Sequence, residues 1–363
     1  MIIISLMKSI KIKLRKFRGF IFRHRISAIA IFLAVLVAIG VTWYMLGKNI
    51  NFVAPAIKTT PPKETRVEAP LTGLLVDPLV ADRRVLAVVI ENHPDARPQS
   101  GYNEADVVYE ALAEGGITRT LALFQSKDST EIGPVRSARD YFIEWLSGFS
   151  AIFAHVGGSS TAIATINSAK IPDLNQFYNA GAFWRSNNRY APHNVYTTTE
   201  KLYATAKANG LAILGAPKAF NFKEEAVEAD RATAQKVVVN FSGPLFQAVY
   251  NYEQKTNVYL RSVAGVPAKD KNTGIQVAPK NIIVEYTSVS SYVNAAGEQA
   301  VRIGTTSGKG LLFQDGRATE ITWNKASRTA RTVYTDTATG KEIYLNRGQT
   351  WIEIVPAEMA VTY

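Results

Sequence analysis

The chain has 363 residues, of which 47% are hydrophobic and 20% charged, so it can bury packed cores and is not a disordered protein. Its formal net charge is +11, but residues 1–47 carry eight basic and no acidic side chains, whereas the remainder carries 33 basic and 30 acidic ones. Because the surplus lies mostly outside the predicted folded part, we expect no nucleic acid partner. The absence of cysteine excludes disulfides, thiolate catalysis, Cys-ligated zinc and lipidation on cysteine.

The first predicted element is an uncharged run from Ile26 to Leu46. A helix of about 20 such residues spans the hydrocarbon core of a bilayer. The cations of residues 1–25 precede the run, and Trp43 and Tyr44 lie near its far end, so the positive-inside rule predicts a cytoplasmic tail and an extracytoplasmic remainder. The alternative is a cleaved signal peptide. Its apolar region is normally shorter and ends at a small-residue cleavage site, so the sequence favours a single uncleaved transmembrane helix over residues 26–46.

Residues 47–70 contain four prolines among Lys, Thr and Glu, which predicts an extended linker. Residues 71–228 predict a first domain of the α+β or α/β class with a mixed sheet, because short apolar runs alternate there with helical patterns. Its predicted strands are Val85–Ile90, Asp106–Ala113, Ile117–Gln125 and Ala151–Val156, the middle two forming a hairpin around Glu114-Gly115-Gly116. Its predicted helices are Arg136–Ser147, an Ala-rich helix after Ser160, and one that opens with a capping box at Thr197–Glu200 and ends at Gly210.

Residues 229–363 predict a smaller, mainly antiparallel β domain. Short β-rich runs alternate there with Gly or polar turns such as Asp315-Gly316. The predicted strands are Lys236–Phe241, Gln247–Tyr252, Val258–Val263, Asn281–Tyr286, Leu311–Gln314, Thr319–Trp323, Thr332–Tyr334, Glu342–Leu345 and Thr350–Val355.

Arginine is the dominant cation of the first domain. The stretch from Arg83 to Ala169 holds six Arg and one Lys, and Arg is favoured where a planar fork holds a carboxylate or phosphate. Arg136 and Arg139 are predicted to share one face at a helix start, where cations oppose the helix dipole and indicate a bound anion or a carboxylate partner. The alternative is internal pairing. The acids available for such pairing are Glu91, Asp106, Glu110, Glu114 and Asp140.

A glycine-rich turn and three histidines complete the candidate site. Gly157-Gly158-Ser159 leads from a predicted strand into a helix, and such a turn can present backbone N–H groups to an anion, although any strand-to-helix turn favours Gly and Ser. The histidines suit hydrogen bonding or proton transfer. Their spacing matches no metal motif and no cofactor motif occurs, so we expect neither a metal nor a cofactor. The predicted ligand-binding set is His93, Arg97, Arg119, Arg136, Arg139, His155, Gly157, Gly158, Ser159, Arg189, His193 and Asn194.

Taken together, these motifs resemble the YerB-like family, bacterial proteins described as lipoproteins and of unknown function. The similar segments include Asn92-His93-Pro94, Glu114-Gly115-Gly116-Ile117-Thr118-Arg119, Gly133-Pro134-Val135-Arg136-Ser137-Ala138-Arg139, His155-Val156-Gly157-Gly158-Ser159, Ala191-Pro192-His193-Asn194 and Gly348-Gln349-Thr350-Trp351-Ile352. The resemblance runs from Pro70 to Pro356. It implies a two-domain extracytoplasmic envelope protein and carries over no catalytic residue. Without a cysteine, a membrane helix must replace the lipid here.

We therefore expect a membrane-anchored, single-pass protein with extracytoplasmic folded domains, which bind an anionic ligand through an Arg/His/Gly-rich site. The expected partner is a phosphate- or carboxylate-bearing wall polymer or its precursor. One alternative is an enzyme of envelope polymers, carrying out phosphoryl transfer or hydrolysis, in which Asp106, Glu110 or His155 moves protons. Another is a structural partner of a second envelope protein. The sequence leaves the oligomeric state open.

Overall fold

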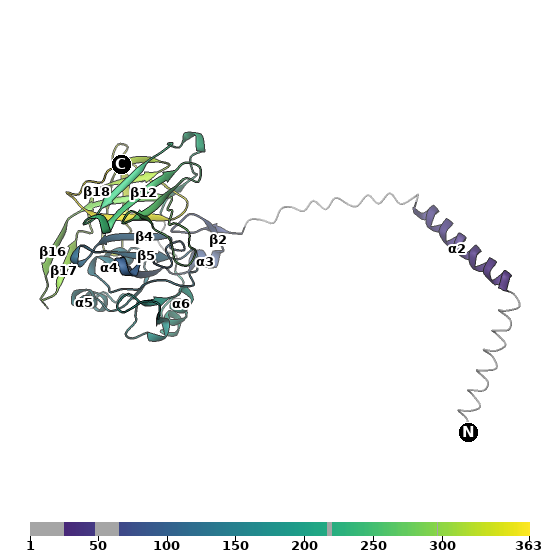
Figure 1. Ribbon diagram of the computed structural model, residues 1–363, viewed down its shortest axis with the longest axis horizontal. Helices are drawn as coiled ribbons and strands as arrows, with labels where there is room; N and C mark the ends of the chain where they lie inside the picture. Colours follow the sequence, from purple (N-terminus) through teal and green to yellow (C-terminus); the bar gives the residue numbers. More distant parts are fainter. Residues whose placement is uncertain (1–24, 48–64, 216–219, 296) are drawn as a thin grey trace, which may run out of the picture. The chain divides into compact units, whose positions relative to one another are not determined.

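The computed structural model describes residues 25–47, 65–215, 220–295 and 297–363. The predicted basic tail and most of the predicted linker lie outside these residues. The chain divides into two compact units, Met1–Lys63 and Glu64–Tyr363. In the first unit, α2 (Arg25–Gly47) confirms the predicted apolar helix (Figure 1). Its segment Ile29–Gly47 is the one described helix that is long and apolar enough to cross a membrane.

A ten-stranded mixed sheet forms the centre of the second unit (Figure 1). Its strands, in spatial order, are β20 (Val333–Asp336), β19 (Arg317–Asn324), β18 (Ser307–Gln314), β15 (Asn281–Thr287), β22 (Thr350–Pro356), β4 (Val107–Leu112), β5 (Thr118–Phe124), β3 (Leu86–Glu91), β6 (Ile152–His155) and β7 (Asp173–Asn175). β22 pairs in parallel with both β4 and β15. Strands from both halves of the sequence therefore share one sheet.

Alternation along the strands sorts their side chains onto two buried faces. Leu86, Val88 and Ile90 of β3 pack on one face, and Ala87 and Val89 on the other. A sheet covered on both sides explains why its central strands read as continuous apolar runs rather than as alternating ones. This burial on both faces is what made the strand Val85–Ile90 predictable from the sequence.

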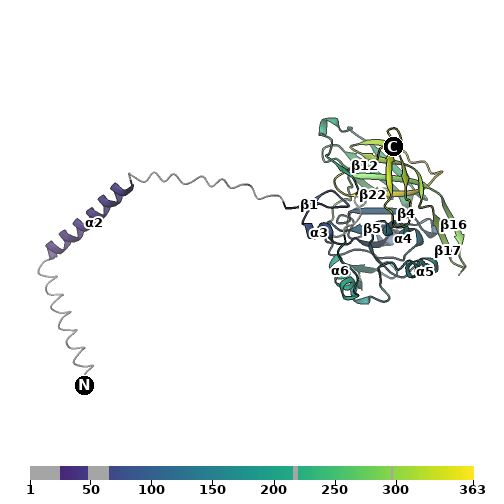
Figure 2. The same cartoon turned by 180° about the vertical axis from the view of Figure 1, so that it is seen from behind.

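The two faces are covered by different elements. A four-stranded sheet and α6 (Thr199–Ala208) cover one face; that sheet consists of β11 (Lys236–Asn240), β12 (Gln247–Glu253), β13 (Val258–Val263) and β14 (Val266–Pro267). The other face is covered by α4 (Asp140–Ser147), α5 (Ser160–Ser168) and the hairpin β16 (Val289–Val293)–β17 (Gln299–Ile303). Figure 2 shows that hairpin beside α5.

The remaining elements are short. The strands and the helix among them are β1 (Val67–Glu68), β2 (Leu75–Val76), α3 (Pro78–Asp82), β8 (Phe183–Arg185), β9 (Val195–Thr197), β10 (Phe222–Lys223) and β21 (Leu345–Asn346). The five 3₁₀ turns are η1 (Pro94–Ala96), η2 (Glu114–Gly116), η3 (Ala180–Ala182), η4 (Glu228–Asp230) and η5 (Pro244–Phe246).

The predicted fold class is confirmed: a mixed sheet with helices is followed by mainly antiparallel strands. The predicted domain boundary falls in η4, and the division into two domains there stays a prediction, since strands on both sides of it share a sheet. The predicted β4–β5 hairpin is also confirmed. The predicted helix start at Arg136 is wrong, because α4 begins at Asp140. The N-cap of α6 is Thr198 rather than Thr197, and the β16–β17 hairpin was not predicted.

A buried carboxyl in the shared sheet gives the folded unit a specific pH dependence. Glu285 of β15 accepts a hydrogen bond of 2.6 Å from the Tyr334 hydroxyl and is 3% exposed. Burial raises the pKa of Glu285 from 4.5 to about 7, and the Tyr334 hydrogen bond only partly opposes this effect. The folded state therefore retains a proton that the unfolded chain loses above its ordinary carboxyl pKa.

We predict that the stability contributed by Glu285 is fully present at about pH 4, below the unfolded carboxyl pKa, and is lost as the pH rises through about 7. The loss should be on the order of 3–4 kcal/mol by about pH 8, since the pKa rises from 4.5 to about 7 and each pKa unit corresponds to about 1.4 kcal/mol. Glu285→Gln removes this titration. Urea unfolding of the two proteins at several pH values measures the difference between their free energies of unfolding. A difference independent of pH would contradict the prediction.

Candidate functional site

Three parallel strands, β3, β6 and β7, end at the same edge of the sheet. The loop after β3 carries His93, the turn after β6 carries Gly157, and the loop after β7 carries Phe177. Ligands of open α/β sheets commonly bind outside the carboxyl ends of such strands. This edge is where most of the predicted site residues meet.

A cavity of about 360 Å³ opens at this edge. It is lined by Arg136, Ser137, Val156, Gly157, Gly158, Phe177, Arg185, Ala191, Pro192 and Val195. The described lining thus contains two guanidinium groups and no carboxylate. Three residues of the predicted ligand-binding set, Arg136, Gly157 and Gly158, belong to this lining. Arg185 is a later arginine of the same predicted domain and was left out of the predicted ligand-binding set. Phe177 was missed, because nothing in its local sequence marks it.

Arg136 is held by a buried acid behind the cavity. Its Nε donates to Oε1 of Glu91 at 3.1 Å, and the Glu91 side chain is 4% exposed. The other oxygen of Glu91 lies 2.8 Å from Nδ1 of His193. Within the described residues, the two terminal nitrogens of Arg136 make no hydrogen bond. The Glu91 carboxylate therefore contacts both Arg136 and His193, and the two terminal nitrogens of Arg136 remain available to bind a ligand.

Arg185 also lines the cavity and is solvent-exposed. Its Nη1 donates to Oδ1 of Asn194 at 2.8 Å, and no acid contacts it in the described part of the chain. Gly157 shapes the floor between the two arginines. It has a φ of +60°, and a Cβ there would lie 2.8 Å from the Phe177 ring. Only glycine lets this ring close against the turn.

Arg119 is a buried cation without an acidic partner among the described residues. It is 7% exposed; its Nη1 donates to the backbone oxygen of Ser137 at 3.2 Å, and its Nε has no partner. Burial, together with the charge of Arg139, lowers the pKa of Arg119 to about 10. The group stays charged at neutral pH. It adds positive charge directly behind Ser137, a residue of the cavity lining.

Arg139 does not line the cavity. Its Nε and Nη2 donate to the two oxygens of Glu114 at 2.5 and 2.6 Å. Burial raises the pKa of Glu114, but the hydrogen bonds and charge of Arg139 outweigh burial and hold that pKa below its usual value. The predicted common helix face of Arg136 and Arg139 is wrong, since Arg136 precedes the helix. Internal pairing, the alternative weighed from the sequence, describes Arg139 with Glu114 and, through its Nε, also Arg136 with Glu91.

His155 hydrogen-bonds the glycine turn and does not line the cavity. It is fully buried, with Nδ1 2.6 Å from the oxygen of Gly157 and Nε2 2.7 Å from Oδ1 of Asp173. Both ring nitrogens therefore lie within hydrogen-bonding distance of an oxygen. His155 thus fixes the turn that forms the cavity floor.

The other predicted site residues hold the surrounding loops. Ser159 caps α5, accepting from the N–H of Ala162 at 3.2 Å. Arg97 donates to Asn92, Arg189 donates to the backbone oxygens of Asp95 and Pro98, and Asn194 donates to the backbone oxygens of Ser186 and Arg189.

The proton carriers proposed for the enzymatic alternative are all buried. Asp106 accepts hydrogen bonds from the backbone of Gln125 and Ser126, and Glu110 pairs with Arg261. Together with His155, they are at most 1% exposed. None of these three side chains can reach a ligand in the cavity.

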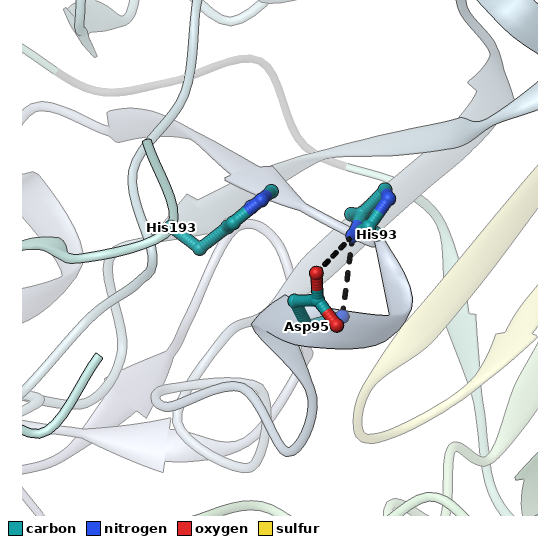
Figure 3. Close-up of side chains that lie close together, drawn as sticks. All are labelled: His93, Asp95 and His193. Atoms are coloured by element: carbon teal, nitrogen blue, oxygen red, sulfur yellow. Dashed lines mark hydrogen bonds and ion pairs between the residues drawn. The ribbon is translucent and has the colours of Figure 1, made fainter. Parts of the chain in front are cut away.

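A second cluster lies beside the cavity, and Glu91 connects the two. His93 and His193 stack with ring centroids 4.8 Å apart and an interplanar angle of 18°, and Asp95 reaches toward them from η1 (Figure 3). The residues that sequence reasoning missed here are Glu91 and Asp95. The sequence suggested Glu91 only as an acidic partner for an arginine. Its contact with His193 joins residues that lie 102 positions apart in the chain, so no local pattern indicates it.

We predict that Arg139→Ala lowers the free energy of unfolding by about 1–3 kcal/mol, because it strands the Glu114 carboxylate without its charged donor. The matched control is Arg328→Ala, which breaks the more exposed pair with Glu144 and should cost at most about 1 kcal/mol. Chemical denaturation of the three proteins measures both effects. Equal stability of Arg139→Ala and the parent would refute the structural assignment of Arg139.

Comparison with known proteins places the chain in a family. Residues 71–212 match the N-terminal domain, and residues 237–352 the C-terminal domain, of a family described as "Protein of unknown function (DUF3048)". The chain is 37% identical over 298 residues to the Bacillus subtilis (strain 168) protein named "Putative lipoprotein YerB", covering 82% of this chain and 88% of that protein.

The crystal structure of the YerB protein from Bacillus subtilis is similar to this fold. The TM-score is 0.73 at 36% sequence identity, and the match covers 82% of this chain and all of the crystallised one. The resemblance to YerB-like proteins deduced from the sequence motifs is thus confirmed, and the chain belongs to the DUF3048 family.

Proposed function

We propose that this chain is a membrane-anchored envelope protein whose folded unit binds an anionic group, a phosphate or carboxylate of a wall polymer or of its precursor. The observation that carries the proposal is the cavity at the carboxyl ends of β3, β6 and β7, lined by Arg136 and Arg185 and by no acid among the described residues.

The charge around the cavity supports an anionic ligand. Two guanidinium groups line the cavity, and a third, that of Arg119, donates to the backbone oxygen of the lining residue Ser137. The one described carboxylate that hydrogen-bonds a lining residue is that of Glu91. His193 also hydrogen-bonds the Glu91 carboxylate, so part of its negative charge is already compensated. Because Arg119 is buried with an unpaired Nε and shares the charge of Glu114 with Arg139, an anion nearby would add countercharge.

The rim of the cavity supports a ligand with a sugar beside the anion. The lining residue Phe177 is 67% exposed, and Tyr178 and Tyr190, each next in sequence to a lining residue, are 85% and 91% exposed. Large exposed aromatic rings mark binding surfaces more often than chance, and they offer flat apolar faces on which a sugar ring can stack. A glycosyl phosphate would bring a charged head to the two arginines and an apolar ring face to these aromatics.

The apolar helix supports attachment to a membrane. The relative YerB is named a lipoprotein, and this chain has no cysteine to carry a lipid. We propose that α2 takes the place of the lipid, with the folded unit outside the membrane, as the cations preceding Ile26 favour.

We predict that inorganic phosphate raises the melting temperature of the full chain in detergent micelles, since a ligand that binds the folded state stabilises it by mass action. Arg185→Ala should weaken phosphate binding roughly ten- to hundredfold, the equivalent of about 1.5–3 kcal/mol for one charge-assisted hydrogen bond. Its stability without phosphate should match the parent's, because Arg185 is exposed and contacts one neutral oxygen.

The matched control is Arg317→Ala. Arg317 is also exposed and donates to one neutral oxygen, that of Asp230, but lies outside the cavity lining. Melting curves over a phosphate series compare the three proteins. Absence of a phosphate-dependent shift in the parent, or equal weakening in both variants, would overturn the proposed function.

A further inference from the structure

We propose that His93, Asp95 and His193 bind a divalent metal ion of the zinc class, with a fourth position open to solvent (Figure 3). The site is separate from the arginine-lined cavity, and the proposal does not depend on the proposed function. It rests on the position of three ligand side chains, on one distance between them, and on a buried carboxylate behind one of them.

Two loops bring the three side chains together. His93 caps η1 and Asp95 lies in its first turn, while His193 comes from the loop between β8 and β9. One ligand atom from each side chain lies within 4.8 Å of the other two. The Asp95 side chain is 73% exposed, His93 32% and His193 17%. An ion can therefore reach the cluster, and its side chains can adjust without disturbing the core.

One edge of the cluster already has the spacing that a metal requires. Nδ1 of His93 lies 3.5 Å from Oδ2 of Asp95. Zinc binds imidazole nitrogen and carboxylate oxygen at about 2.0–2.2 Å in tetrahedral geometry, which places two ligand atoms about 3.3–3.6 Å apart. The His93–Asp95 pair has that spacing as it stands, and an ion bound there would displace the 3.2 Å hydrogen bond that Nδ1 of His93 accepts from the Asp95 N–H. His193, whose ring is stacked on that of His93, completes the set by turning its ring so that a nitrogen lone pair points at the ion.

Glu91 prepares His193 for this role. Its Oε2 lies 2.8 Å from Nδ1 of His193, and the carboxylate is buried and fixed on its other oxygen by Arg136. A carboxylate on one ring nitrogen holds the hydrogen there and leaves the lone pair of Nε2 for a metal. Glu91 is a positioning residue in this arrangement and does not touch the ion.

The donor set selects the class of metal. Two imidazoles and one carboxylate suit Zn²⁺ and neighbouring first-row ions, whereas Ca²⁺ and Mg²⁺ prefer oxygen ligands throughout. Three protein ligands with an open fourth position also match the number found where zinc retains a water. The competing explanation is an ion pair between a protonated His93 and Asp95, with His193 merely stacked on the pair.

The test is zinc titration by calorimetry of the full chain in detergent micelles, purified without a polyhistidine tag and treated with a chelator. The parent should bind one Zn²⁺ at this site and give no comparable heat with Mg²⁺. His193→Gln and Asp95→Asn should each weaken zinc binding at least tenfold, since even the loss of a residue supporting a ligand costs about 10–100-fold. Co²⁺ in place of Zn²⁺ should give visible absorption that the variants lose.

The control is Asp128→Asn, because the Asp128 side chain is 72% exposed, closely matching Asp95, and lies outside the cluster. It should bind zinc like the parent. Circular dichroism melts check that each variant is folded. Asp95→Asn should melt like the parent, whereas His193→Gln should melt at a lower temperature but still cooperatively, because it removes a partner of the buried Glu91 carboxylate. The proposal is overturned if the parent shows no saturable zinc site, or if folded His193→Gln or Asp95→Asn binds zinc as tightly as Asp128→Asn does.

Discussion

A single buried guanidinium, that of Arg261, joins the two halves of the sequence. It comes from β13 and is 2% exposed; its Nη2 donates to Oε2 of Glu110 on β4 at 2.6 Å, and it lies 4.4 Å from the ring centroid of Trp351 on β22. Glu110 and Glu353 are direct partners on the adjacent strands β4 and β22, so two buried carboxyls face each other there. Without the cation, this part of the sheet would hold like charges side by side.

The neighbours of Arg261 balance the remaining charge. Its Nε donates to the Tyr250 hydroxyl, which in turn donates to Glu353. Burial and the charge of Glu110 raise the pKa of Glu353, so its carboxyl keeps a proton more readily than an ordinary glutamate does. Breaking a buried pair of this kind typically costs about 3–5 kcal/mol, because the remaining partner is left charged and unsolvated. The β11–β14 sheet is thereby fixed to the central sheet.

The same network extends to the candidate site. Glu110 accepts hydrogen bonds from Thr118 and from Asn92, the residue directly after β3. Asn92 accepts in turn from Arg97 and Gln99, which shape the loop that carries His93 and Asp95. The loop beside the cavity therefore takes its position from a core network that includes a strand of the second half. This provides a physical reason for the two family domains to occur in one chain.

Most of the central strands could be predicted from short patterns of apolar and turn residues. The features that were predicted wrongly depend on contacts between residues far apart in the sequence. Continuous apolar runs indicated β3 and β6, and Glu114-Gly115-Gly116 indicated the β4–β5 turn. The helical spacing after Arg136 was misleading, because the N–H of Arg136 donates to the oxygen of Val89 and keeps this segment extended beside β3.

Long-range contacts also limited what could be predicted of the site. The excess of Arg over Lys and the glycine turn correctly drew attention to Arg136 and Gly157, which line one cavity. The pairing of His93 with His193, and of Glu110 with Arg261 across 151 residues, depends on topology that no short sequence window contains.

The central claim is that the two halves of residues 64–363 form one cooperative unit through the shared sheet and Arg261. Differential scanning calorimetry of the full chain in detergent micelles tests it most directly. The account predicts one unfolding transition, with a ratio of calorimetric to van't Hoff enthalpy of about one. Two resolved transitions, or a ratio well above one, would contradict it.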